Sequence, residues 1–139
     1  MHMPIRQGGF TLLEFTAVIA IAGTLSAVAV PRYVDMMRSA RLVKMELARR
    51  AVSESAQVYH VKWQLAGSPQ TASVLDEVQM NGTGYPTSTG ILVAAGLADN
   101  YDIRAAGVIA VDPQHPDCSL VYAADTGTSV VNYGDGSNC

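Results

Sequence analysis

The two cysteines are the residues of this sequence whose chemistry is easiest to specify. Cys118 and Cys139 both lie within the last 22 of the 139 residues. In an oxidising compartment a disulfide between them would close a 22-residue loop and stabilise the fold by roughly 3 kcal/mol on the chain-entropy estimate. The alternatives are two free thiols or a bond to another chain. An intrachain disulfide is the prediction if this part of the chain is exported.

The other reactive side chains form no pattern typical of an active site or a metal centre. His2, His60 and His115 are far apart in the sequence, and no cysteine pair has zinc-ligand spacing. Serine, histidine and aspartate occur without a nucleophile-elbow or oxyanion-loop signature. We therefore expect no catalytic residue, no metal site and no cofactor.

Two short polar segments could bind a ligand but have simpler structural interpretations. Asp99, Asn100 and Asp102 carry oxygen atoms suited to calcium, although a capped turn is the preferred interpretation. The sequence Asn-Gly-Thr at residues 81–83 fits an N-glycosylation acceptor, but a glycine turn is preferred there.

Glu14 is the only charged residue between Phe10 and Val30, a run of 21 residues. A helix of that length spans roughly 30 Å, about the thickness of the hydrocarbon core of a bilayer. Inserting a carboxylate into such a helix costs about 3 kcal/mol, so Glu14 should have a partner or reach the headgroups. Arg6 precedes the run and Arg32 follows it, so the flanking charges do not define the direction of crossing.

A glycine pair, Gly8 and Gly9, lies immediately before the apolar run. A secretory signal peptide has its small-residue cleavage site after a shorter apolar region, whereas a cut after Gly9 would remove the leader and keep the helix. The cut would create an α-amino group on Phe10, which lies four residues from Glu14. These opposite charges could neutralise each other within one chain or between neighbours.

Together these features resemble the N-terminus of type IV prepilins. The resemblance covers about residues 8–33: a glycine before the cut, a phenylalanine after it, a glutamate at the fifth mature position and a proline closing the span. It implies that a prepilin peptidase cuts between Gly9 and Phe10 and methylates the new Phe10 amine. It also implies that Glu14 pairs with the Phe10 amine of a neighbouring subunit.

The same resemblance implies a location, partners and a function. The chain would cross the bacterial inner membrane once, with the lipid bilayer around it, before an assembly platform there adds it to copies of itself in a helical filament. Gly23 and Pro31 would make the helix locally pliable. The expected function is a structural subunit of a surface pilus for adhesion, motility or DNA uptake.

Two related functions are alternatives: a pseudopilin of a type II secretion system, and a minor adhesive pilin at a tip. The late cysteine pair favours the pilus, since major pseudopilins tend to lack it. Together with the Gly-Tyr-Pro-Thr stretch at residues 84–87, the cysteines are most similar to mannose-sensitive haemagglutinin-type pilins.

Four segments are expected to position these residues: a cleaved leader at 1–9, a transmembrane or filament-core helix at 10–31, an amphipathic helix at 32–67 and a globular head at 68–139. The helical pattern ends at Ala66, before a glycine and a proline.

An apolar stripe with spacings of three and four follows the amphipathic helix and is expected to face the sheet of the head. Its members are Met36, Ala40, Val43, Leu47, Ala51, Ser55, Val58, Val61 and Leu65.

Strands are predicted at residues 107–111, 119–123 and 128–133, because these runs are rich in valine, isoleucine and tyrosine. Residues 125–127 would join the last two as a hairpin, and residues 91–97 are predicted to be helical. The predicted fold class is α+β: a long N-terminal helix packed on a small antiparallel sheet of three or more strands.

Charge is divided unevenly along the chain. Residues 32–62 carry seven basic and three acidic groups, whereas residues 63–139 carry one basic and eight acidic groups. Such surfaces could attract one another between stacked copies, or both could simply be solvated. The acidic head and the net charge of −3 argue against direct nucleic-acid binding.

Overall fold

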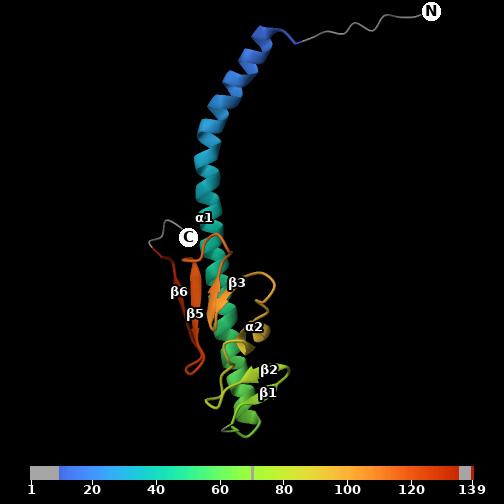
Figure 1. Cartoon of the computed structure of the whole chain (residues 1–139), viewed down its shortest axis with the longest axis vertical. Coiled ribbons are helices and arrows are strands. Elements are labelled where there is room, and N and C mark those ends of the chain that lie inside the picture. Colours follow the sequence, from blue (N-terminus) through green and yellow to red (C-terminus); the bar gives the residue numbers. More distant parts are fainter. Residues whose placement is uncertain (1–9, 70, 135–138) are drawn as a thin grey trace, which may run out of the picture. The chain divides into compact units, whose positions relative to one another are not determined.

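The computed structural model describes residues 10–69, 71–134 and 139 (Figure 1). Its longest element, helix α1, runs from Leu12 to Leu65, which confirms the predicted continuous helix. Within this helix the chain divides into two compact units, residues 1–37 and residues 38–139. The described part of the first unit belongs almost wholly to α1, whereas the second unit holds the rest of the helix and all strands of the described residues.

The C-terminal end of α1 has a Schellman cap, which satisfies carbonyl groups that the last turn leaves without a helical partner. Gly67 has a φ of +89°, and its N–H donates to the carbonyl of Gln64 at 3.1 Å. The N–H of Ser68 donates to the carbonyl of Trp63, also at 3.1 Å. The glycine that the sequence placed after the helix is therefore the residue whose left-handed backbone ends it.

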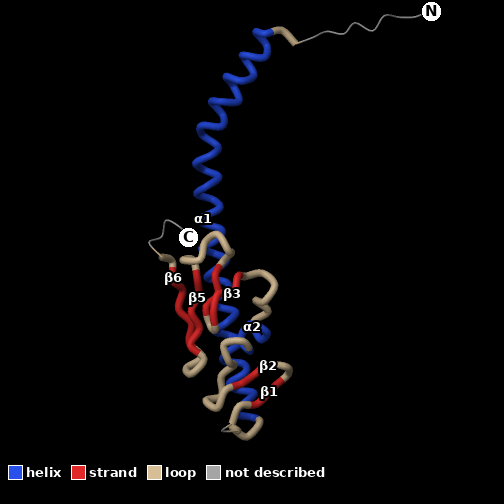
Figure 2. Tube along the Cα trace, viewed as in Figure 1, coloured by secondary structure: helices blue, strands red, loops and turns tan. Residues whose placement is uncertain are grey.

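Four strands of the second unit form an antiparallel sheet in the order β3-β4-β5-β6 (Figure 2). Consecutive strands are neighbours, so the sheet is a simple meander. The strands are β3 (Asp102–Ala105), β4 (Val108–Ala110), β5 (Ser119–Ala123) and β6 (Thr128–Asn132).

A separate two-stranded hairpin and a short helix fill the stretch between α1 and this sheet. Strand β1 (Ser73–Leu75) pairs antiparallel with β2 (Val78–Met80), and α2 spans Gly90–Ala94. The α+β prediction and its three strands are confirmed. Strands β1, β2 and β3 were missed because they are only three or four residues long. The predicted helix at 91–97 ends early, before Gly96, whose φ is +65°.

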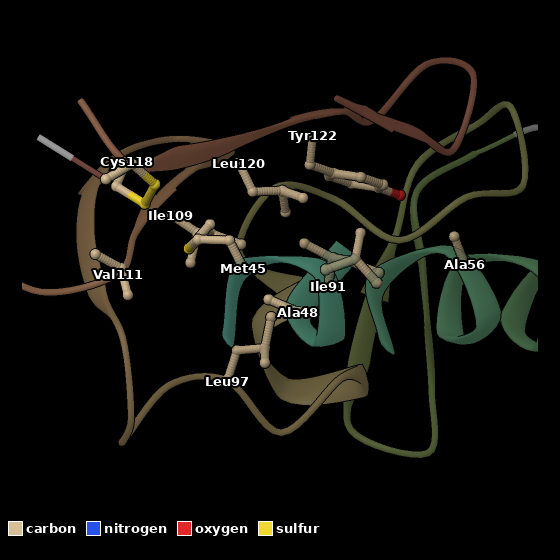
Figure 3. Close-up of a cluster of buried hydrophobic side chains, with 12 residues drawn as sticks. Met45, Ala48, Ala56, Ile91, Leu97, Ile109, Val111, Cys118, Leu120 and Tyr122 are labelled. Atoms are coloured by element: carbon tan, nitrogen blue, oxygen red, sulfur yellow. A yellow bond between two sulfur atoms is a disulfide. The ribbon is translucent and has the colours of Figure 1, made fainter. Parts of the chain in front are cut away.

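The main core lies between α1 and the four-stranded sheet, and Ile91 of α2 is buried in it (Figure 3). From α1 it takes residues with small or flexible side chains, which allow the helix to approach the sheet closely. Its buried members are Met45, Ala48, Val52, Ala56, Ile91, Leu97, Ile109, Val111, Cys118, Leu120, Tyr122 and Cys139. A smaller cluster joins Trp63 of α1 to Val78 and Met80 of β2.

Most of the apolar stripe that was expected to face the sheet is instead exposed, so this prediction is wrong. Leu47 is 60% exposed, and Val43, Val58, Val61 and Leu65 are more than half exposed as well. The helix has a second row of apolar residues that also recurs every three or four positions. Met45, at 0% exposure, lies two residues before Leu47, and two residues turn the helix by about 200°. The sheet therefore covers the opposite face.

Candidate assembly site

A reciprocal cap at the start of α1 fixes the side chain of Glu14. The N–H of Thr11 donates to Oε2 of Glu14 at 2.8 Å, and the hydroxyl of Thr11 donates to the same oxygen at 2.9 Å. The N–H of Glu14 in turn donates to Oγ1 of Thr11 at 3.2 Å. This is a capping box, which satisfies backbone donors that the first helical turn leaves unpaired. Sequence reasoning missed Thr11, although Thr-x-x-Glu before an apolar run is the signal for such a cap.

The cap places the carboxylate of Glu14 at the N-terminal end of the helix, where the helix dipole favours negative charge. The predicted ion pair with the Phe10 amine requires a free α-amino group. In this chain Phe10 is joined to Gly9 by a peptide bond, so the ion pair stays a prediction. Gly9 lies outside the described residues. Phe10 itself is 85% exposed.

The first half of α1 has a surface suited to lipid. It contains an 18-residue window with a mean hydropathy of 1.9, none of which is buried, so by length and composition this helix could cross a membrane. Its hydroxyl groups are bonded within the helix. Those of Thr16 and Thr24 donate to the carbonyls of Leu13 and Ile21 at 2.9 Å, and that of Ser26 donates to Ala22 at 2.7 Å. Each hydroxyl thus has a partner that needs no water.

Gly23 and Pro31 both lie inside this helix, which continues through them without a break. A Cβ atom added at Gly23 would meet nothing within 4 Å, so the close approach of another part of the chain does not explain the glycine. Both residues weaken a helix, glycine by about 1 kcal/mol and proline by about 3 kcal/mol relative to alanine. Their proposed role, local loosening in an assembly, stays a prediction.

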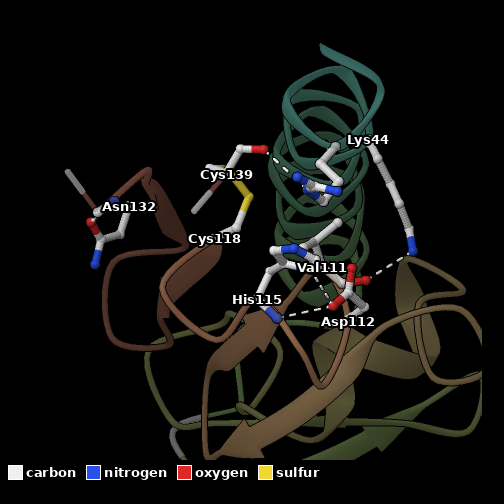
Figure 4. The surroundings of a disulfide bond; sticks show 9 residues. Lys44, Val111, Asp112, His115, Cys118, Asn132 and Cys139 are labelled. Carbon is white, nitrogen blue, oxygen red and sulfur yellow. Dashed lines mark hydrogen bonds and ion pairs between the residues drawn. A yellow bond between two sulfur atoms is a disulfide. The ribbon is translucent and has the colours of Figure 1, made fainter. Parts of the chain in front are cut away.

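In the second unit a disulfide joins Cys118 and Cys139 within the chain, with Cα atoms 5.0 Å apart (Figure 4). Both residues are fully buried in the main core. Nε of Arg41 donates to the carbonyl of Cys139 at 3.1 Å, which ties Cys139 to α1. Lys44, one turn further along, donates to the carbonyls of Asn100 and Val111 at 2.8 and 2.9 Å.

The loop before Cys118 is held by Asp112. Its Oδ1 accepts hydrogen bonds from the backbone N–H groups of Gln114 and His115 and lies 2.7 Å from Nδ1 of His115. Burial alone would raise the pKa of Asp112. The hydrogen bonds and the neighbouring imidazole outweigh burial, so the pKa lies below its ordinary value. The ionised carboxylate is thus the form that supports this loop.

Neither of the two polar segments considered for ligand binding forms a ligand site among the described residues. Asn81 of the first segment has a structural role, and Asp99 and Asp102 of the second belong to no cluster of metal ligands in the part of the chain that the structure describes. Asn81 uses both ends of its amide. Nδ2 donates to the carbonyl of Ala124 at 2.7 Å, and Oδ1 accepts from Thr83 and from the N–H of Tyr85. Within residues 10–69, 71–134 and 139, no group of three or more His, Cys, Asp or Glu side chains could hold a metal ion.

Comparisons with known proteins identify the family. No family model and no solved structure matches the chain. It is 37% identical to the type IV narrow pilus major component PilA5 of Thermus thermophilus, over 60% of this chain and 67% of that protein. It is 29% identical to fimbrial protein Q of Moraxella bovis, over 72% and 76% of the two chains. It is also 34% identical to a fimbrial protein of Neisseria meningitidis, over 79% of this chain and 52% of that protein. The helix with its capped Glu14, the small antiparallel sheet and these relatives agree: the chain belongs to the type IV pilins.

Proposed function

We propose that this pilin is the structural subunit of a surface pilus, a filament built from many copies that serves adhesion, motility or DNA uptake. The observation that carries the proposal is the exposed apolar surface at the start of α1. All described residues from Phe10 to Ala40 are exposed, and the hydropathy there is typical of a membrane span. So much apolar surface is unfavourable in water, so a bilayer or other copies must cover it. In a filament subunit the bilayer covers this apolar surface before assembly, and the helices of other copies cover it afterwards.

The proposed pathway begins in the bacterial inner membrane, where the helix spans the bilayer once. A prepilin peptidase cuts between Gly9 and Phe10 and methylates the new amine. An assembly platform then moves the subunit into the filament. The relatives support a pilus over a secretion pseudopilus or a tip adhesin, because one is named as the major component of a pilus and two as fimbrial proteins.

Glu14 would direct each subunit into register with its neighbour. Its carboxylate and the Phe10 amine both lose water when helices pack together, and pairing offsets the desolvation of each charge. The capping box supports this role, because Thr11 holds the carboxylate at the helix end that carries the new amine. The second unit, which is acidic in its later part, is not expected to bind nucleic acid directly.

The decisive measurement is mass spectrometry of filaments sheared from the cells that make this protein. The expected N-terminus is methylated Phe10. An intact Met1 terminus on assembled protein would contradict the proposed processing. Filaments that lack this protein altogether would contradict the proposed subunit role.

The role of Glu14 is tested by Glu14→Ala, with Glu54→Ala as the matched control. Glu54 is an exposed glutamate on the same helix, in the second unit. The Glu14 variant should be processed and inserted normally but yield few filaments, because the amine of a neighbour then has no counter-charge. The Glu54 variant should assemble normally. Filaments in normal number from Glu14→Ala would rule out the ion pair as an assembly determinant.

A further inference from the structure

Strand β6 lies at one edge of the four-stranded sheet, where β5 is its only strand partner among the described residues (Figures 1 and 2). Its pairing with β5 keeps one register from Thr128 to Asn132, without a bulge. Residues 126–134 contain no charged side chain and no proline. Soluble proteins usually protect an edge strand with charges, proline or a bulge, because an open edge can pair with another strand.

The opposite edge has this protection. The register of β3 against β4 shifts between Ile103 and Ala105, which marks an irregularity in the strand. Asp102 and Arg104 also form an ion pair on this strand, and Arg104 donates to the carbonyl of Pro113 at 2.7 Å. The two edges of one sheet thus differ: β3 has features that protect it against strand pairing, whereas β6 has none of these features among the residues that the structure describes.

The backbone groups that β6 presents can be identified from the hydrogen-bond alternation of the sheet. The N–H of Tyr122 donates to the carbonyl of Gly107. In antiparallel pairs hydrogen-bonding positions alternate, so the even-numbered residues of β5 bond to β4 and the odd-numbered ones to β6. Val121 therefore bonds to its partner Val130. It follows that the N–H and C=O groups of Ser129 and Val131 point away from the sheet, four groups in all.

A short apolar row on the exposed face of the sheet leads to this edge. Val108 pairs with Val121, and Val121 pairs with Val130, so the three side chains lie in line across the strands. Val121 is 46% exposed and Val130 is 68% exposed. The exposure therefore increases toward the open edge, where a further strand would cover Val130.

We propose that β6 pairs with β6 of a second copy of this chain, antiparallel and centred on Val130. This register places Thr128 opposite Asn132 and Val130 opposite Val130 on the exposed face. Polar side chains therefore face polar ones, and valine faces valine. It lets Ser129 and Val131 of each copy exchange their four outward backbone groups, and it continues the valine row into the second sheet. The uncharged edge matters because residues 63–139 are otherwise acidic and would repel another copy.

This interface goes beyond the proposed filament subunit, because it uses only the sheet of the second unit. Five residues from each copy bury much less than the roughly 1,200 Å² of a stable protein complex, so a single pair associates weakly. An antiparallel pair of this kind is two-fold symmetric, so it does not repeat between neighbours of one helical filament and would join copies on two filaments that lie side by side. Many pairs act together there, because each pair that forms holds the next two copies at a high effective concentration.

Cysteine substitution tests both the pairing and its register. In the proposed pair Val130 faces Val130 at a position without hydrogen bonds between the copies, where Cα atoms are about 4.5 Å apart and a disulfide can form. The full chain carrying Val130→Cys should therefore form a covalent dimer in detergent under mild oxidation. Thr128→Cys alone should not, because its counterpart lies about 13 Å away along the strands. A mixture of Thr128→Cys and Asn132→Cys should cross-link, because these positions face each other.

The expected yield of dimer from Val130→Cys is about ten-fold that of Thr128→Cys alone. Similar yields from Val130→Cys, Thr128→Cys and Asn132→Cys tested singly would indicate random collision and overturn the proposal. So would the absence of a dimer from folded Val130→Cys chain. Neither result bears on the proposed filament, which the N-terminal mass measurement tests independently.

A charged side chain in place of Val130 gives a second test, which uses chemical cross-linking and needs no added cysteine. Val130→Lys places like charges opposite each other and should abolish chemical cross-linking between the second units. Val74→Lys is the matched control, because Val74 of β1 is 66% exposed on a different hairpin. Equal cross-linking in both variants would overturn the proposal.

Discussion

Asn81 is expected to hold the connection between α1 and the sheet, and its replacement tests how the second unit is stabilised. Nδ2 bonds to the carbonyl of Ala124 at 2.7 Å, at the end of β5. Oδ1 accepts from the N–H of Tyr85 at 3.0 Å and from the N–H and hydroxyl of Thr83 at 3.1 and 2.7 Å. One side chain thus links two segments 43 residues apart in sequence.

The magnitude follows from which of these bonds are protected from water. The bonds to Ala124 and Tyr85 are partly buried, and each should contribute about 1 kcal/mol. The two bonds to Thr83 are exposed, so water can replace them and they should contribute about 0.5 kcal/mol each. Asn81→Ala should therefore lower the free energy of unfolding by about 3 kcal/mol.

Two controls separate the parts of this network. Asn81→Asp keeps the acceptor but loses the donor to Ala124, so it should cost about 1–2 kcal/mol. Thr83→Val removes only an exposed hydroxyl bond and should cost less than about 0.5 kcal/mol. The assay is urea unfolding of the full chain in detergent, followed by fluorescence of the single tryptophan. Trp63 is buried in the second unit and is 8% exposed. A loss below about 0.5 kcal/mol for Asn81→Ala would refute the assigned role.

Two further predictions concern charge and backbone geometry. Hydrogen bonds from Arg49 and Arg50 lower the pKa of Glu46 to about 2, so the stability that this carboxylate contributes is present above its ordinary pKa of 4.5 and is lost as the pH falls from there toward about 2. In urea titrations the wild type should lose more stability than Glu46→Gln over this interval, and parallel curves would contradict the assignment. Asp76 and Glu77 form the two-residue turn of the β1–β2 hairpin with φ values of +48° and +69°, where glycine has no steric penalty. Glu77→Gly should raise the free energy of unfolding by about 1 kcal/mol, and a lower urea midpoint would show that the side chain stabilises the turn.

The parts of the fold that the sequence predicted are those with a strong local signal. The first half of α1 is almost wholly apolar, and its length and composition are those of a membrane-spanning helix. Gly67 ends the helix through its own backbone conformation. Strands β4 and β6 are rich in β-branched residues, and β5 contains Val121 and Tyr122, both of which favour strands. Each of these signals lies within the segment that it specifies.

The missed features depend on contacts that local sequence does not report. The turn of the β1–β2 hairpin uses Asp76 and Glu77 in place of the Asn-Gly pair that signals such a turn. Asp76 there forms an ion pair with Lys62 of α1 at 2.5 Å, a partner 14 residues away. Some basic residues that the sequence suggested would form a charged surface instead bond to other groups of the same chain. Lys62 is one example, and Arg41 and Lys44 bond to backbone carbonyls of the second unit.

The apolar stripe on α1 was predicted to face the sheet but is mostly exposed, and this error bears on the function. Periodicity reports that a helical face is apolar, but it cannot tell which of two apolar faces the sheet will cover. The sheet covers the face with Ala48, Val52 and Ala56, whose small side chains allow close packing, and leaves Val43 and Leu47 exposed. A subunit that functioned alone would have little reason to keep the second face apolar. A subunit that packs among copies of itself needs such a face, so the residues that misled the fold prediction support the proposed filament.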